Sequence, residues 1–265
     1  MLALAVANAP ARAQSQPTVV EVPPGDNGQK AVQLETFFYQ PSGSGPFPLV
    51  ILSHGSAGGN ARRSLPSRNE AEFFTGQGFA VLVPMRRGRG KSTGISREYE
   101  DRHCETQAWE AGLRDAMQEI DAVLVHAQSL PQLDISKVIL AGVSRGGFLS
   151  VAYAAQGAKR TAVKAVVNFV GGWVAQAEDR CPQDFNLQQF ALYGKSVRAP
   201  GLWLYGAQDL FYGDDAIRTY VDAYRAGGAP IGFELISGIP GNGHWLPQHR
   251  ERWEGPLRRF LDSLP

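Results

Sequence analysis

The chain is poor in cysteine and carries almost no net charge. It holds two cysteines in 265 residues, too few for a metal-binding cysteine cluster. Its formal net charge of +1 gives no bulk attraction to nucleic acid or to a membrane surface. No internal apolar run is long enough to span a bilayer, and no internal repeat is visible. With 43% hydrophobic and 19% charged residues, the composition is that of a globular protein large enough for one α/β domain.

The N-terminus is apolar and rich in small residues but lacks a basic region. Residues 2–7 are apolar, and residues 11–13 offer an A-x-A cleavage site, which is typical of the end of a secretory signal peptide. We therefore expect residues 1–13 to be a partial signal peptide and the protein to be periplasmic or secreted. A disordered tail is the alternative. The prolines and glycines of residues 14–29 predict a flexible N-terminal segment.

From residue 30 onward, strand patterns and helix patterns alternate. Apolar runs predict strands at 32–38, 47–53, 79–84, 137–143, 163–170, 201–206 and 231–236. Helical patterns occur at 68–76, 105–127 and 148–156. This alternation predicts one α/β domain over residues 30–265, with a mostly parallel sheet and helices on both faces. In such a sheet the functional site lies at the carboxyl ends of the strands.

Residues 142–146 read G-V-S-R-G, which has the form G-x-S-x-G. They lie between the strand 137–143 and the helix 148–156, so Ser144 is expected on a sharp strand-to-helix turn with its hydroxyl exposed. A Cβ at either glycine would collide in so tight a turn. The pattern makes Ser144 the candidate nucleophile, and a glycine-rich turn without chemistry is the alternative.

Two candidate partners of Ser144 follow it in the chain. Asp209 comes just after a predicted strand, and His244 lies in a glycine-rich loop near the end of the chain. A histidine can accept the proton of an attacking serine, and a carboxylate can hold the other imidazole nitrogen. Asp214 and Asp215 are rivals for the acid, but they open the next helix and resemble N-cap residues. A turn aspartate and a surface histidine are the alternatives.

A glycine-rich loop, residues 54–59, follows the strand 47–53. Backbone N–H groups in such a loop can hold the negative charge that develops on a carbonyl oxygen. We assign one donor to the amide of Ser56 and the other to the amide of Arg145, the residue after the candidate nucleophile. His54 has the spacing of a residue that braces this loop.

The connection at about residues 171–199 is unusually long, and long connections are often functional. We expect it to form a small cap insertion over the nucleophile. Its Trp173, together with Phe211 and Trp245, is a candidate for the substrate pocket. The alternative is that these aromatic side chains pack the cap onto the body of the domain.

The segment 86–91 is the densest run of positive charge. No basic helix or aromatic platform accompanies it, which argues against nucleic-acid binding. We expect the loop to be braced by ion pairs with carboxylates such as Glu98, Glu100 or Asp101. The alternative is that one arginine faces the site and favours a substrate that carries a carboxylate.

Taken together, these motifs resemble those of the α/β-hydrolases. Within that superfamily the chain is similar to the serine-containing dienelactone hydrolase-like and acyl-peptidase-like esterases. The matching pieces are residues 54–59, 87–94, 142–146, 205–209 and 243–244, and the resemblance covers about residues 30–263. It implies an α/β-hydrolase fold and a serine hydrolase of carboxylic esters that works through an acyl-enzyme. It implies a small-molecule ester as substrate and no cofactor or metal.

The chain departs from the family pattern at the nucleophile. Dienelactone hydrolases use cysteine, whereas this chain has Ser144, and serine favours ordinary ester hydrolysis. A thioesterase, a polyester hydrolase or a small peptidase of the same fold shares all of these motifs. From a different class, a non-catalytic binding protein on this scaffold is the remaining alternative.

The two cysteines lie in different parts of the predicted domain. Cys104 follows the arginine-rich loop, and Cys181 lies in the predicted cap, so both are expected near the carboxyl edge of the sheet. An exported protein meets an oxidising compartment. We predict a disulfide between them that fixes the cap to the body, with two unrelated buried thiols as the alternative.

Overall fold

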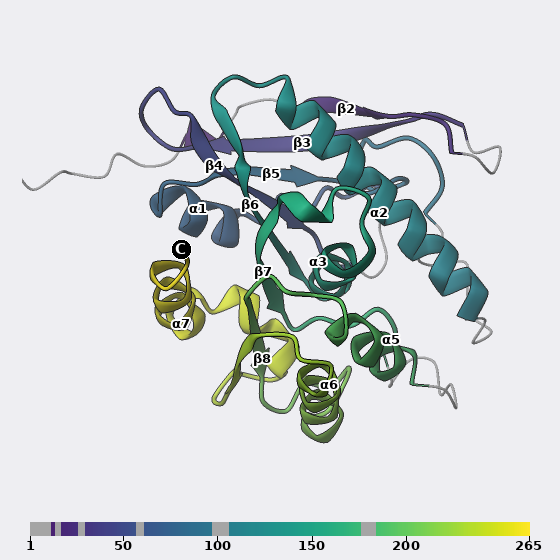
Figure 1. Cartoon of the computed structure of the whole chain (residues 1–265), viewed down its shortest axis with the longest axis vertical. Coiled ribbons are helices and arrows are strands. Elements are labelled where there is room, and N and C mark those ends of the chain that lie inside the picture. The colour runs from purple at the N-terminus through teal and green to yellow at the C-terminus, as the bar shows by residue number, and fades with distance from the viewer. Residues whose placement is uncertain (1–11, 14–16, 26–29, 57–60, 97–105, 176–183) are drawn as a thin grey trace, which may run out of the picture.

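The centre of the molecule is a twisted, mostly parallel sheet (Figure 1). The computed structural model describes residues 12–13, 17–25, 30–56, 61–96, 106–175 and 184–265. Its nine strands are β1 Arg12–Ala13, β2 Thr18–Val22, β3 Val32–Gln40, β4 Phe47–Ser53, β5 Ala80–Pro84, β6 Leu133–Val143, β7 Val163–Phe169, β8 Gly201–Gly206 and β9 Ile231–Ile236. Their order is β1-β3-β5-β4-β6-β7-β8-β9, and β2 also pairs with β3.

Every neighbour pair from β5 to β9 along this order is parallel, whereas β3 runs antiparallel to β1, β2 and β5. The fold class predicted from the sequence is therefore confirmed. The central strands are apolar throughout because both of their faces are covered. In β4, for example, the four residues from Leu49 to Leu52 have no exposed surface.

Helices cover both faces of the sheet (Figure 1). They are α1 Arg68–Gly76, α2 Thr106–Gln128, α3 Arg145–Gln156, α5 Phe185–Gly194, α6 Asp214–Ala226 and α7 Arg250–Asp262, with short 3-10 helices η2 Arg160–Ala162 and η3 Gly243–Gln248. Helices α1 and α7 lie on one face, and α2, α3, α5 and α6 lie on the other (Figure 1). Among the helices of the described residues, none has the length and apolar character needed to cross a membrane.

The strand register brings the ends of distant strands together. Ser53 at the end of β4 pairs with Gly142 near the end of β6, and Gly206 at the end of β8 pairs with Ile236 at the end of β9. Since the strands are parallel, the loops that follow them leave the sheet at the same edge. Within the described residues, the candidate site residues follow these strands, as the sequence predicts.

One N-terminal expectation is wrong. Within the segment 14–29, which the composition predicts to be flexible, residues Thr18–Val22 form the strand β2 and pair with β3 along its length. Val20 and Val22 are each 1% exposed, while Glu21 between them points outward. This alternation of β-branched and polar residues is a strand signal, and the flanking prolines concealed it.

The prediction of a cap over the nucleophile is wrong for the part of that connection that the structure describes. Residues 184–199 contain α5, a helix that packs against α6 and α3 and connects β7 to β8 within the helical layer (Figure 1). Phe190 and Tyr193 place their rings 4.9 Å and 5.9 Å from that of Phe148. The aromatic residues therefore belong to the core between helices. Residues 176–183, with Cys181, lie outside the described residues.

Candidate active site

Ser144 lies on the turn between β6 and α3. Its backbone has φ 54° and ψ −124°, a conformation that L residues rarely adopt. The Ser144 N–H donates to the carbonyl of Phe169 at 2.8 Å, and its own carbonyl accepts from Phe148 N–H at 3.1 Å. These backbone bonds hold the strained turn, and such strain is typical of functional sites.

The two glycines of the motif are required by close backbone packing. A Cβ at Gly142 would lie 2.1 Å from the carbonyl oxygen of Gly146, and a Cβ at Gly146 would lie 2.0 Å from that of Ser53. Neither oxygen belongs to a flexible side chain that could move away. The steric reason expected from the sequence is therefore confirmed at both positions.

This packing predicts that Gly146→Ala destabilises the fold. We expect a loss of about 3 kcal/mol in the free energy of unfolding, because the new methyl group overlaps β4 backbone. Gly76→Ala is the matched control, since an added Cβ there meets nothing within 4 Å. Alanine in that last turn of α1 should leave the stability unchanged or raise it by up to about 1 kcal/mol. Urea unfolding of both variants measures the difference, and equal stabilities would contradict the packing argument.

Asp209 and His244 form a direct pair. The Nδ1 atom of His244 lies 2.8 Å from Oδ2 of Asp209, whose side chain is completely buried. The other carboxylate oxygen accepts from the backbone N–H groups of Phe211 at 2.8 Å and Tyr212 at 3.4 Å. The carboxylate is thus fixed in one orientation, and it holds the imidazole so that Nε2 is left for chemistry.

Asn242 holds the two loops of this pair together. Its side-chain oxygen accepts from the His244 N–H at 2.9 Å and from the Leu210 N–H at 3.0 Å. The backbones also approach closely, since a Cβ at Gly243 would lie 2.4 Å from the carbonyl oxygen of Gly206. Asn242 was not singled out from the sequence, although an asparagine before Gly-His is a typical start of a short helix.

The rival acids lie elsewhere. Asp214 and Asp215 form the first turn of α6. Oδ1 of Asp214 accepts from the N–H of Gln208 at 2.7 Å, and Gln208 has a left-handed φ of 62°. Asp214 therefore stabilises the turn that carries Asp209.

The loop after β4 runs against the candidate nucleophile. A Cβ at Gly55 would lie 3.2 Å from the Cβ of Ser144, and Ser56 lines the same cavity as Ser144. Arg145 begins α3, where unpaired helix N–H groups and the helix dipole favour a negative charge. The Arg145 side chain is anchored away from the cavity, because its Nε donates to the carbonyl of Trp173 at 2.7 Å. Gly55, which precedes Ser56, and Arg145 thus both lie beside Ser144.

His54 braces this loop, as the sequence predicts. Its Nε2 accepts from the N–H of Arg86 at 3.0 Å, which leaves the ring proton on Nδ1 to donate to the carbonyl of Gly55 at 2.6 Å. The Arg86 guanidinium donates in turn to the carbonyl of His54 at 2.6 Å. The histidine is buried and plays a structural part.

The arginine-rich loop is braced by ion pairs as expected, but the partner carboxylates lie on α2. The Nε of Arg87 donates to Glu119 at 2.6 Å, and its Nη1 lies 3.4 Å from Asp115. Burial raises the pKa of Glu119 to about 7, while the Arg87 charge opposes that rise. The partners expected from the sequence, Glu98, Glu100 and Asp101, lie outside the described residues.

Tyr212 is a neighbour of the pair that the sequence did not reveal. Its ring lies 5.6 Å from that of His244, and its hydroxyl donates to the carbonyl of Gly172 at 2.9 Å. Burial and the Asp209 charge raise the pKa of the phenol, and the Arg145 charge opposes the rise. Tyr212 therefore belongs to the loop that carries Asp209 and packs against His244.

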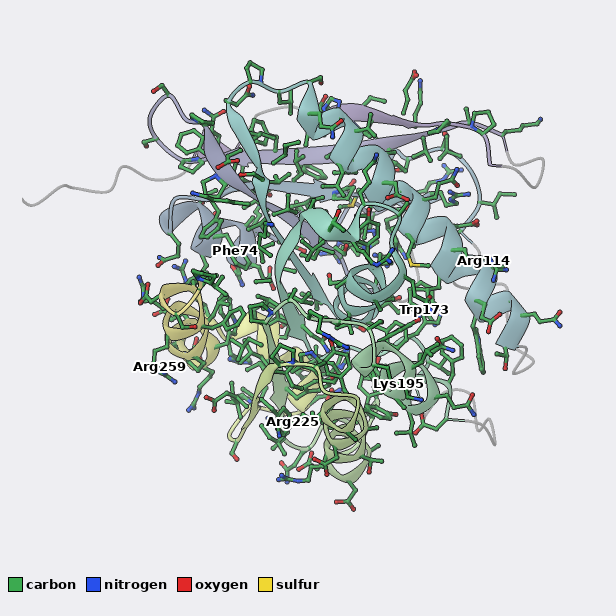
Figure 2. All side chains as sticks on the ribbon, in the orientation of Figure 1. Phe74, Arg114, Trp173, Lys195, Arg225 and Arg259 are labelled. Carbon is green, nitrogen blue, oxygen red and sulfur yellow. The ribbon has the colours of Figure 1, made fainter. Side chains whose placement is uncertain are left out.

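A cavity of about 550 Å³ opens beside Ser144 and His244. Of the three aromatic residues expected in the pocket, Phe211 and Trp245 line it, and Phe211 lies 4.5 Å from the His244 ring. Trp173 does not line it. That side chain is 1% exposed, its ring lies 6.0 Å from that of Phe148, and it lies among the side chains between α3 and α5 (Figure 2). Trp173 belongs to the core because the segment after β7 turns toward the helical layer.

Comparisons with known proteins agree with this geometry. The chain is 29% identical over 142 residues to the quorum-quenching protein AidA of Acinetobacter baumannii, a match that covers 54% of this chain and 42% of that protein. It therefore spans less than half the length of this relative.

Two solved structures have the same fold. Est1E from Butyrivibrio proteoclasticus, with ferulic acid bound, has a TM-score of 0.66 at 17% identity, covering 93% of this chain and 98% of the other. A dienelactone hydrolase-like promiscuous phosphotriesterase from metagenomic libraries has a TM-score of 0.65 at 18% identity, covering 97% and 100%. Residues 34–245 match the model of the dienelactone hydrolase family. The chain therefore belongs to the dienelactone hydrolase family.

Proposed function

We propose that the protein hydrolyses carboxylic esters through an acyl-enzyme formed on Ser144. The observation that carries the proposal is the buried Asp209, which holds His244 beside the cavity that Ser144 also lines. An imidazole fixed by a carboxylate at one nitrogen is suited to act as a base at the other. Membership of a hydrolase family supports the same reaction.

The reaction takes two steps with the same groups. His244 Nε2 takes the proton of the Ser144 hydroxyl as Oγ attacks the ester carbonyl carbon. The amides of Ser56 and Arg145 stabilise the oxyanion, and the intermediate collapses as His244 gives its proton to the leaving alcohol. Water then attacks the acyl-enzyme, with His244 again as base, and releases the acid and the free serine.

The nature of the ester follows in part from the nucleophile. A serine in place of cysteine favours ordinary esters over dienelactones, and the apolar cavity wall with Phe211 and Trp245 suits an aromatic or alkyl group. The ferulic acid bound to one structural relative is an aromatic example of such a group. Thioesters, polyesters and small peptides are the competing substrates.

A substrate screen tests this proposal. We expect hydrolysis of p-nitrophenyl esters of graded acyl length, and of aryl esters, to exceed that of thioester, polyester and peptide substrates. Reaction with a fluorophosphonate separates an enzyme from a non-catalytic binding protein, because only an activated serine reacts. Absence of both labelling and turnover would support the binding protein.

We further propose export, with a signal peptide at residues 1–13, of which the structure describes only Arg12 and Ala13. We also propose a disulfide between Cys104 and Cys181, two residues that lie outside the described ones. The bond would join the segment before α2 to the segment before α5. For a closed loop of this length the chain-entropy model gives an upper value of about 4–5 kcal/mol.

Mass spectrometry tests the disulfide. Protein purified from its native compartment should gain two alkyl groups only when it is reduced before alkylation under denaturing conditions. Two alkyl groups gained without reduction would contradict both the bond and this support for export.

A further inference from the structure

Glu70 is a buried carboxylate in the wall of the candidate active site. The residue is 6% exposed, and it lines the same cavity as Ser144 and His244. Within the described residues, no hydrogen bond or ion pair joins its carboxylate to another side chain. A buried charge without a partner is costly, so the position of Glu70 calls for an explanation.

Helix capping does not provide that explanation. Ser67 and Glu70 have the S-x-x-E spacing of a capping box at the start of α1. However, Ser67 has a left-handed φ of 46°, and its side chain makes no capping hydrogen bond. The polar contact that Glu70 does make is with its own backbone N–H. The carboxylate is therefore available to a ligand in the cavity.

Two aromatic residues of the cavity also suit a positive charge. Phe211 and Trp245 line it, and the faces of aromatic rings attract cations. Arg63 and Arg68 also line it, but both residues are exposed, and solvent screens exposed charges. A buried carboxylate acts at lower dielectric and so outweighs them at the inner wall.

We propose that the cavity binds esters that carry an ammonium group, with Glu70 as the counter-ion and Phe211 and Trp245 as the aromatic walls. The inference rests on the proposed esterase function and names its substrate class. The ammonium would supply the partner that Glu70 lacks, while the ester carbonyl reaches Ser144. In this proposal Glu70 determines substrate specificity and takes no part in the bond-breaking steps.

The charge state of Glu70 gives the preference a pH dependence. Burial raises the pKa of Glu70 to about 7, and its own backbone N–H opposes the rise. The titratable and charged groups around it are Arg68 and Glu72 on α1, Tyr39 on β3, Arg63 in the preceding loop and His244 on η3. The carboxylate ionises as pH rises through about 7, so the preference for a cation should grow over that range and be lost below it.

A pair of esters of equal shape tests the proposal. Butyrylcholine carries a quaternary ammonium, and 3,3-dimethylbutyl butyrate replaces it with a neutral tert-butyl group. We expect the kcat/KM ratio of the two esters to favour the cation by about tenfold or more above neutral pH. In Glu70→Gln that ratio should fall at least about tenfold and lose its pH dependence. In the matched control Glu72→Gln, an exposed carboxylate on the same helix, the ratio should be unchanged.

Binding of tetramethylammonium separates this inference from the proposed function. Calorimetry on the wild-type protein should detect the cation, and Glu70→Gln should weaken its binding, whether or not any ester is hydrolysed. The inference would be overturned if the protein hydrolysed esters but Glu70→Gln left the ratio unchanged, or if the wild-type protein preferred the neutral ester. The proposed esterase function would still hold in either case. Glu70-dependent cation binding without turnover of any ester would support the site and overturn the esterase. The pH profile of the wild-type ratio provides a test even if the variant fails to fold.

Discussion

Ser144→Ala is expected to lower kcat for ester hydrolysis by about 10⁴-fold or more while the protein remains folded. The loss follows because no other hydroxyl replaces the attacking atom, and only the amides of Ser56 and Arg145 and substrate binding remain. The fold should survive, since the backbone bonds of residue 144 do not involve its side chain. Alanine and serine share the same conformational limits at the positive φ, so we expect a stability change within about 1 kcal/mol.

Kinetics and labelling check this result together. Turnover of a p-nitrophenyl ester gives kcat, and circular dichroism of the same sample shows that the fold is intact. Ser150→Ala is the matched control on α3, because its buried hydroxyl donates to the Gly146 carbonyl at 2.9 Å. That variant should still react with a fluorophosphonate, whereas Ser144→Ala should not. If Ser144→Ala retained more than about a tenth of the wild-type kcat, the nucleophile would have to be sought elsewhere.

Sequence patterns predicted the sheet well because its strands carry their own signals. The apolar runs of β4, β8 and β9 coincide with the observed strands, and the helical spacing of apolar residues places α2 within one residue. β6 differs from its prediction, since it begins at Leu133 instead of residue 137. Its early part pairs with the start of β4 across a register shift, and such pairing depends on the neighbouring strand.

The site was predictable where its chemistry depends on residue type and chain order, and missed where it depends on contacts between loops. Asn242 is recognisable only once Leu210, 32 residues earlier, is seen to donate to it. Glu70 looks like an ordinary charged residue of an amphipathic helix until its burial in the cavity is known. Trp173 was predicted in the pocket but lies in the core. The sequence does not distinguish the two, because an aromatic residue in a long connection can pack in either place.

Replacing Asp209, the candidate acid, is expected to give the second large loss of activity. Asp209→Asn should lower kcat by about 10³–10⁴-fold, because an amide nitrogen can face the Nδ1 of His244 and favour the wrong tautomer. The accepting oxygen near the N–H of Phe211 is retained in asparagine, so the acid loop should keep its shape. The expected loss is therefore chemical, and it should appear in kcat with little change in the thermal unfolding temperature.

Asp214→Asn is the matched control, and it carries the opposite expectation. Asp214 accepts a hydrogen bond from the Gln208 N–H at 2.7 Å, and the side-chain oxygen of asparagine can accept the same bond. Activity should therefore change by no more than a few-fold, since no charge next to His244 is lost. Measuring kcat for both variants on the same ester ranks the two carboxylates directly. A large loss in Asp214→Asn with little in Asp209→Asn would place the acid on α6, and the hydrogen bond between Asp209 and His244 would then be a structural contact.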